Sequence, residues 1–326
     1  MSKFPLLAAL VTLPAFVSPL AAQKGEYFSR HDQPIVVCNG TRGTQRSIHE
    51  TNNSRRMLHI DPSGCLDVRS EGPVALNDDD SDIVSLSSGG FLAITEIRGG
   101  LTRHMTFDER NGRIERRYTE NGSERPESSA NSWLRTVLPQ IARESSIGAE
   151  ARANRILQRR GPAGVIAEME AIGSESVKTI YMNALLADSR VGPAELRDIG
   201  RRVPRLFSSD TKRNAVLVSL LSRAGRDPAV VDAVLESTRE ISSDHQRGTV
   251  LKQAIGTGTM TKESMLIALR SISGISSDRE HANALIELAS RQSVMTDSVV
   301  RRAFLDSIKG ISSSSEYRRV MESVVR

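Results

Sequence analysis

Apolar residues follow two different periods along this chain, and the change falls near Pro126. Before it, short runs of alternating apolar and polar residues lie between Gly-Gly and Asn-Gly pairs, a pattern typical of β-strands joined by tight turns. After it, apolar residues recur with the spacing of a helix face. The sequence therefore predicts an α+β protein of two domains: an antiparallel β-rich domain over residues 23–127 and an all-α domain over residues 128–326.

The turn signals of the first part predict individual strands. Residues 61–64, Asp-Pro-Ser-Gly, favour a β-turn that joins strands at 56–60 and 65–69 into a hairpin. Further alternating runs predict an antiparallel meander with strands at 91–97, 101–107 and 113–119. Residues 39–53 are polar and predict a loop.

A Ser-Ser-Asp triplet recurs at a fixed period in the second part. It begins at Ser208, Ser242 and Ser276, 34 residues apart; related triplets begin 34 residues earlier at Ser174 and 36 residues later at Ser312. A period in the range of 20–50 residues indicates stacked structural repeats. Serine oxygens accept the free N–H groups of a starting helix. We interpret the triplet as a helix cap with no further chemistry of its own.

Each repeat contains the pattern of a helical hairpin. The first helix carries an i, i+1, i+4, i+5 apolar stripe, and the second helix begins at Gly192-Pro193, Asp227-Pro228, Thr261 or Thr296. Ahead of the repeats, we expect a helix capped by Ser128 or Ser129 and kinked at Pro139, then a pair at 149–160 and 162–172 joined at Gly161. The expected units lie near 146–173, 174–207, 208–241, 242–275 and 276–311, with a terminal helix at 312–326.

These helical pairs resemble HEAT-type repeats, which implies a right-handed α-solenoid. The tetratricopeptide pattern has the same length, but its Trp, Gly, Tyr and closing Pro are missing. Because each hairpin of such an array buries one face on its neighbour, the array is expected to present an extended binding surface.

Several motifs carry a closer resemblance. They are Asp-Ile-Val-Ser-Leu at 82–86, Gly-Gly at 89–90, Gly-Arg-Ile-Glu-Arg-Arg-Tyr at 112–118, Trp133-Leu134 with Leu138-Pro139, and the recurring Ser-Ser-Asp. Residues 82–326 are similar to the C-terminal part of certain secreted or membrane-sensor bacterial proteins. In that group the module is sometimes fused to a membrane metallopeptidase of the antibiotic-sensor type. The His-Glu-x-x-His motif of that enzyme is absent from this sequence, so the resemblance implies no peptidase activity.

The N-terminus has the pattern of an export signal. Lys3 precedes an apolar stretch over 6–16, and Leu20-Ala21-Ala22 offers small residues for cleavage before Gln23. A signal peptide over residues 1–22 is the prediction, and an uncleaved membrane anchor is the alternative, disfavoured by Pro14 and by the short apolar stretch. The mature protein is expected in the periplasm or outside the cell.

Export also changes what the two cysteines predict. An oxidising compartment favours a disulfide between Cys38 and Cys65, with two buried thiols as the alternative.

The sequence offers little for catalysis or metal binding. No two of the histidines have ligand spacing, and no Gly-x-Ser-x-Gly elbow or phosphate-binding loop is present. Asp78, Asp80 and Asp82 have the spacing of the first ligands of a calcium loop, but the following residues do not continue it, so we expect a polar turn. The protein is predicted to be no enzyme and to need no cofactor, with an uncharacterised hydrolase as the third alternative.

Charge points to one candidate binding site. Residues 23–128 carry 14 basic and 17 acidic side chains, whereas residues 129–326 carry 29 and 22. Arg197, Arg201 and Arg205 recur at i, i+4, i+8 with Arg202 beside them, so they share one side of a helix. Their alternative role is a solvated face balanced by nearby acids.

These observations predict a non-enzymatic scaffold of the bacterial envelope or exterior that binds a protein partner. The alternative is a sensor or regulatory module that binds an envelope polyanion or cell-wall component through these arginines. Nucleic acid is not expected as a ligand because no aromatic residues for base stacking are interleaved with the arginines.

Overall fold

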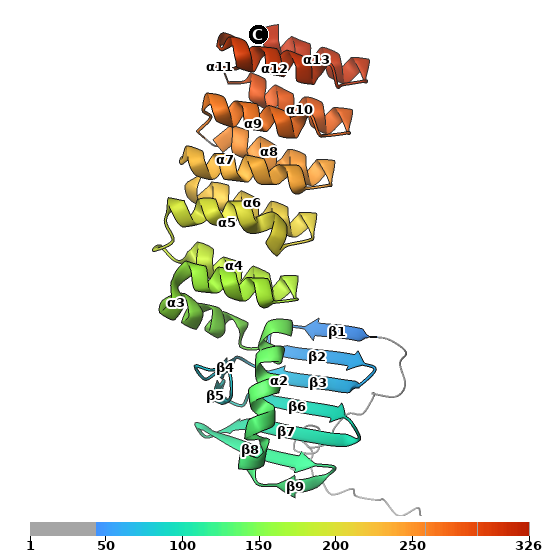
Figure 1. Ribbon diagram of the computed structural model, residues 1–326, viewed down its shortest axis with the longest axis vertical. Helices are drawn as coiled ribbons and strands as arrows, with labels where there is room; N and C mark the ends of the chain where they lie inside the picture. Colours follow the sequence, from blue (N-terminus) through green and yellow to red (C-terminus); the bar gives the residue numbers. More distant parts are fainter. Residues whose placement is uncertain (1–43, 258, 292, 326) are drawn as a thin grey trace, which may run out of the picture.

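The computed structural model describes residues 44–257, 259–291 and 293–325. It is an α+β protein with an antiparallel sheet followed by a helical region, as the change of period predicts (Figure 1). The predicted signal peptide at 1–22 and Cys38 lie outside the described residues. Within these ranges, no helix is both long enough and apolar enough to cross a membrane.

The main sheet has the strand order β1-β2-β3-β6-β7-β8-β9. The first predicted hairpin joins β2 (Ser54–Asp61) to β3 (Gly64–Glu71), with Ile60 opposite Cys65, so the predicted turn at 61–64 is confirmed. The other predicted strands are confirmed as β6 (Phe91–Arg98), β7 (Leu101–Arg110) and β8 (Arg113–Glu120). The Asn-Gly turn after β7 places Asn111 at φ 53° and Gly112 at φ 79°, angles that this pair tolerates.

Two predictions for the sheet were wrong or incomplete. The expected loop at 39–53 contains β1 (Gln45–Glu50), whose six residues are all exposed. Among the described residues, β1 pairs with β2 alone and buries no face, so no alternation of apolar and polar residues marks it. A small separate hairpin, β4 (Val74–Leu76) with β5 (Ile83–Leu86), lies between β3 and the predicted meander in the chain. The sheet ends at the short strand β9 (Ser123–Arg125).

Helix α2 (Asn131–Glu144) lies across one face of the sheet and completes its core (Figure 1). It buries Trp133, Leu134 and Leu138 against strand residues that include Ile94 and Phe107. A short 3₁₀ turn, η1 (Glu127–Ala130), precedes it, and no side chain caps α2, so the predicted cap at Ser128 or Ser129 was wrong. The helix continues through Pro139.

The helical region stacks hairpins on one another (Figure 1). Helix α3 (Ala149–Ala171) divides at Gly161, where φ is 66°, as predicted for this junction. We call the opening helix of each later hairpin its first helix: α4 (Glu175–Ala187), α6 (Asp210–Ala224), α8 (Asp244–Thr257), α10 (Asp278–Ala289) and the terminal α13 (Ser314–Val325). The second helices are α5 (Pro193–Leu206), α7 (Pro228–Ser237), α9 (Lys262–Ile272) and α12 (Ser298–Ile308).

Equivalent helices of successive hairpins lie against each other. Each first helix contacts the next first helix along the chain, and each second helix contacts the next second helix. The 3₁₀ turn η2 (Thr238–Glu240) follows α7, and a one-turn helix, α11 (Ser293–Thr296), precedes α12. One buried apolar cluster runs through the whole stack, from α3 to Val320 of α13.

The serine caps are present where the repeat predicts them. The hydroxyl oxygen of Ser209 accepts the N–H of Lys212, and that of Ser277 accepts the N–H of Glu280. Thr261 caps α9 as expected, but α12 is capped by Asp297 rather than by Thr296. The extra turn α11 occupies Thr296, which moves the start of the helix by one residue.

The acidic residue after each cap has a role that the sequence interpretation missed. Its carboxylate reaches the next hairpin and accepts the backbone N–H groups of both opening serines. In the α6–α8 pair, Asp210 accepts from Ser242 at 3.0 Å and Ser243 at 2.8 Å. The same contact is made by Glu175 to 208 and 209, by Asp244 to 276 and 277, and by Asp278 to 312 and 313. We call these four contacts the carboxylate clamps; they fasten each hairpin to the next one.

A second series of contacts binds the ends of the helices. The residue four positions after each cap donates to backbone carbonyls where a helix ends. These donors are Lys178 to Leu206, Arg213 to Phe207 and Glu240, and Arg247 to Ile241 and Gly274. In α10 the same position holds His281, which is buried with Nε2 3.0 Å from the Ser307 hydroxyl.

The histidine at this position predicts that the C-terminal end of the stack loses stability in acid. Burial lowers the pKa of His281, although the Asp278 carboxylate opposes the shift. The stability that neutral His281 contributes is therefore present above the ordinary histidine pKa of about 6.5 and is lost as the pH falls through the lower folded-state pKa. Between pH 7 and pH 5, urea unfolding should show a larger loss in the free energy of unfolding for the native chain than for His281→Arg. That variant keeps its charge and can donate to Ile275 and Gly310, as Arg247 does one hairpin earlier. An equal loss in both proteins would contradict this role.

Candidate functional site

The predicted arginine site lies on the outer side of α5. Arg197, Arg201, Arg202 and Arg205 are all exposed, as expected for one helix side. Leu196, Ile199 and Val203 form the opposite, buried side. We call the four residues the α5 arginine row.

Acidic neighbours balance half of this row. Arg202 pairs with Asp198 at 3.0 Å and with Glu170 of α3 at 3.2 Å, and Arg201 lies 3.7 Å from Glu236 of α7. Within the described residues, Arg197 and Arg205 have no carboxylate at ion-pair distance. The middle of the row is therefore a balanced helix face, and its two ends are cations without a described carboxylate partner.

The α5 arginine row is part of a longer surface. The ion pair between Arg201 and Glu236 shows that the exposed sides of α5 and α7 meet, and the stack continues through α9 and α12. Exposed charges of both signs lie along this surface, and they include Glu263 and Arg270 of α9, which pair at 3.2 Å. We call the outward sides of α5, α7, α9 and α12 the second-helix face. A mixed-charge surface of this kind can form polar contacts with a protein and gives orientation more than raw affinity.

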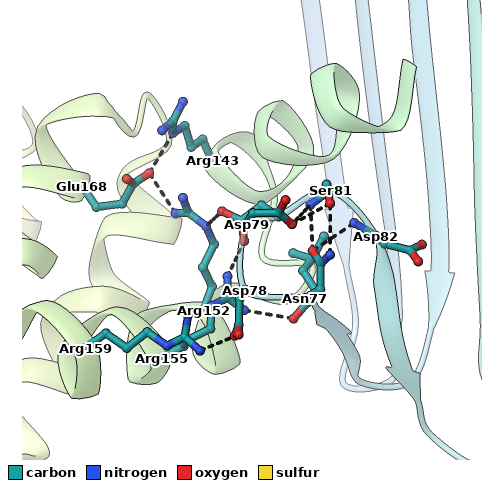
Figure 2. Close-up of polar contacts among 12 residues, drawn as sticks. Asn77, Asp78, Asp79, Ser81, Asp82, Arg143, Arg152, Arg155, Arg159 and Glu168 are labelled. Carbon is teal, nitrogen blue, oxygen red and sulfur yellow. Dashed lines mark hydrogen bonds and ion pairs between the residues drawn. The ribbon is translucent and has the colours of Figure 1, made fainter. Parts of the chain in front are cut away.

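Buried charges join the sheet domain to the helical region (Figure 2). Arg152 of α3 is its centre: Nε donates to Asp80 at 2.6 Å, and Nη1 donates to Glu168 at 2.8 Å and to the Tyr181 hydroxyl at 2.7 Å. Arg155 also donates to Asp80, and Arg143 of α2 donates to Glu168 at 2.7 Å. We call these six side chains the junction network, because its members come from the β4–β5 loop, α2, α3 and α4.

Hydrogen bonds within this network oppose the effect of burial on the pKa values of Arg152 and Glu168. Burial alone would lower the pKa of Arg152, but hydrogen bonds to Glu168, Tyr181 and Asp80 outweigh it and raise the pKa above its ordinary value. Burial likewise opposes ionisation of Glu168, yet its bonds from Arg143 and Arg152 hold the pKa below the usual range. Burial raises the pKa of Tyr181, so its hydroxyl keeps its proton. The network can therefore position the sheet domain on the helical region.

Of the three aspartates with calcium-like spacing, two pair with α3 across this junction and the third pairs within the sheet domain. Asp80 has φ 56° in the turn, and its carboxylate forms ion pairs with Arg152 and Arg155. Asp78 pairs with Arg159 at 2.5 Å, and Asp82 pairs with Arg116 of β8 at 3.0 Å. Their oxygens therefore point in different directions. Among the described residues, no group of three or more His, Cys, Asp or Glu side chains could hold a metal ion.

A polar hollow of about 370 Å³ lies where α2 meets β6, β7 and β8. Glu96 accepts from Trp133 Nε1 at 2.8 Å and from Arg103 at 3.0 Å. The Tyr118 hydroxyl donates to Glu120 at 2.7 Å, and burial followed by this hydrogen bond raises the pKa of Tyr118 to about 12. Tyr118 is thus a donor and no base at neutral pH. The polar groups here satisfy one another and hold α2 on the sheet.

Sequence reasoning found the α5 arginine row but missed the junction network and the clamps. Asp80 and Arg152 lie 72 positions apart and carry no shared motif, so no local signal could pair them. The sequence did carry a signal for the clamps, because an acid directly follows the capping serine in four successive repeats.

Comparison with known proteins adds no relative. No protein-family model, no curated protein and no solved structure matches this chain. The resemblance to HEAT-type repeats and to the secreted bacterial module therefore stays a prediction. The predicted disulfide also stays a prediction, because Cys65 is buried in β3 but Cys38 lies outside the described residues.

Proposed function

We propose that this chain is a non-enzymatic, exported scaffold that binds a protein partner along its helical stack, organised as a HEAT-like right-handed α-solenoid. The four carboxylate clamps carry the proposal. Each clamp sets one hairpin in a fixed position on the next by two charge-assisted backbone hydrogen bonds. Repeated through the stack, this gives a long surface of defined shape, which is how repeat proteins recognise partners.

The junction network extends this rigid surface to the sheet domain. Because Arg152 is bonded to Asp80, Glu168 and Tyr181 at once, the sheet domain is held to α3 and α4 by buried bonds and not by a linker alone. A partner that contacts the stack therefore meets the sheet domain in a fixed place. We expect the signal peptide to direct this scaffold to the periplasm or the exterior.

Affinity capture from an envelope extract tests the proposal. The full chain is compared with the double variant Glu236→Lys, Arg270→Glu, which reverses two exposed charges of the second-helix face while leaving the buried side intact. A protein retained in stoichiometric amount by the native chain and lost by the variant is the expected result. Equal retention by both, with circular dichroism showing that both are folded, would exclude the second-helix face as the binding surface.

A specific observation favours a second function, the binding of an envelope polyanion. Arg197 and Arg205 are exposed and lie at the two ends of the α5 arginine row without a described carboxylate partner. A polyanion that spans the row would release counterions from these guanidinium groups, so its binding would weaken with salt.

The triple variant Arg197→Ala, Arg201→Ala, Arg205→Ala tests this second function. If the row binds polyanions, the variant should elute from a heparin column at clearly lower salt than the native chain, because three phosphate- or sulfate-binding cations are lost. The matched control is Arg190→Ala, which should leave elution unchanged. Arg190 is exposed but already pairs with Asp188 at 2.5 Å. Identical elution of the triple variant and the native chain would rule out the polyanion site.

A further inference from the structure

The terminal helix α13 exposes part of a side that every other first helix buries. Met321 is half-buried, whereas its equivalents in the earlier repeats are fully buried: Met182, Leu217, Leu251 and Leu285. Tyr317 is 43% exposed at the position that holds buried His281 in α10. The apolar pattern of α13 is therefore that of a first helix whose covering layer is incomplete.

Helix α12 is also incompletely covered, on the side that faces away from α9. Leu305 is 42% exposed, but the equivalent residues Leu235 of α7 and Leu269 of α9 are buried. Each of those leucines belongs to a second helix that the next second helix contacts. Leu305 and Met321 thus lie on the two helices that a following second helix would cover together.

The preceding hairpins show what occupies the equivalent place. Helix α12 itself packs on both α9 and α10, and α9 packs on both α7 and α8. Beside α13 there is a hollow of about 400 Å³, lined by Ile311, Ser312, Ser314, Tyr317, Arg318 and Met321. We call the hollow, together with the exposed side of α12 around Leu305, the terminal groove. Ile311 and Met321 give the hollow an apolar part, and its serines and Arg318 give it a polar part.

The charges around this groove define the occupant further. Arg301 and Arg302 of α12 and Arg318 of α13 are exposed, and among the described residues none of the three has a carboxylate at ion-pair distance. At longer range, Arg302 helps to lower the pKa of Asp306, after the hydrogen bond from Lys309. An occupant with acidic residues beside its apolar stripe would compensate these cations. The position that carries the clamp acid in other first helices is Ser314, so the groove meets its occupant through side chains and not through a clamp.

We propose that the terminal groove binds one amphipathic helix of a protein partner, whose apolar stripe is flanked by acidic residues. This inference rests on the proposed scaffold function and gives it a defined site and a class of partner. The mode is a helix laid into a groove, with apolar anchors at i, i+3 or i+4, and i+7. Burying one side chain the size of Leu or Met contributes about 1.5–3 kcal/mol, so Leu305 and Met321 are the expected anchors.

A synthetic peptide tests the groove directly. The peptide carries the sequence of residues 297–309 with R301E and R302E, stapled across its outward side because a helix this short is marginal in water. Fluorescence anisotropy of the labelled peptide, titrated with the full chain, should show saturable binding. Leu305→Asp and Met321→Asp should each weaken binding by about tenfold or more, since each removes an apolar anchor of that size.

Two controls keep the outcome clear. Ile48→Asp changes an exposed apolar residue of β1 on the sheet and should not alter binding of the peptide. A scrambled peptide of the same composition should not bind. Because Leu305 and Met321 are partly exposed, their variants are expected to fold, which circular dichroism verifies.

Absence of saturable binding, or binding that Leu305→Asp and Met321→Asp leave unchanged, overturns the proposal. Sedimentation of the native chain tests whether a second copy of the chain fills the groove instead. A dimer that Leu305→Asp converts to monomer would show that it does, and the proposal would be wrong. If the peptide fails to bind while capture through the second-helix face persists, only this inference falls and the scaffold function stands.

Discussion

Arg152→Met is expected to lower the free energy of unfolding by about 3–5 kcal/mol, because it leaves buried carboxylates without their shared cation. The Arg152 side chain is 5% exposed, and Asp80 and Glu168 are 11% and 8% exposed. Methionine fills much of the same volume but donates no hydrogen bond. Arg155 and Arg143 remain beside the two carboxylates, so the variant should fold with reduced stability. Urea denaturation followed by circular dichroism measures the loss.

The matched control is Arg159→Met in the same helix. Arg159 pairs with Asp78 across the same junction, but both side chains are more than half exposed. Exposed pairs contribute at most about 1 kcal/mol, so this variant should be nearly as stable as the native chain. Equal effects of the two substitutions would mean that the junction network does not hold the sheet domain to the helices.

Removing one clamp should have the second largest effect. Asp244→Ala deletes the acceptor of two backbone N–H groups, at 3.1 Å from Ser276 and 2.8 Å from Ser277. Hydrogen bonds to charged groups contribute about 1.5–3 kcal/mol each, and partial exposure of Asp244 reduces this, so a loss of about 2 kcal/mol is expected. Hydrogen exchange should also speed up at the amides of Ser276 and Ser277 and remain slow at the first clamp, between α4 and α6.

The variant Glu263→Ala distinguishes the stability that a clamp contributes from the stability that any acid near a helix N-terminus contributes. Glu263 is also an acid in the first turn of its helix, but it is exposed and pairs only within α9, with Arg270. Its removal should cost less than about 1 kcal/mol. A clamp variant that loses no more stability than Glu263→Ala would leave the carboxylate contact without a structural role.

Regular periods explain which parts of the fold could be predicted. The hairpin of β2 and β3 follows from Asp61-Pro62-Ser63-Gly64, and the helix starts follow from serine caps that return with the repeat. These signals are local, since the turn or cap acts within four residues. They therefore survive in a sequence considered alone.

The parts that could not be predicted depend on contacts between distant residues. Strand β1 has no buried side, so only its backbone pairing with β2 defines it. Arg152 gave no signal because its polar side chain lies in a helix and its three partners are distant in sequence, in the β4–β5 loop, later in α3 and in α4. The clamp acids were visible as a pattern, but their target lies one hairpin further along the chain.

Site-specific photo-crosslinking in producing cells tests the scaffold function most directly. A photoreactive residue is placed singly on the second-helix face, at Glu236 or Arg270, and in the sheet domain, at exposed Val84 or Arg113. All four positions are exposed, so the fold is unaffected and differences report on the partner. Discrete adducts with one protein from Glu236 and Arg270, and few from the sheet positions, are the expected result. Adducts from Val84 and Arg113 alone would show that the sheet domain is the binder and would contradict the proposed role of the helical stack.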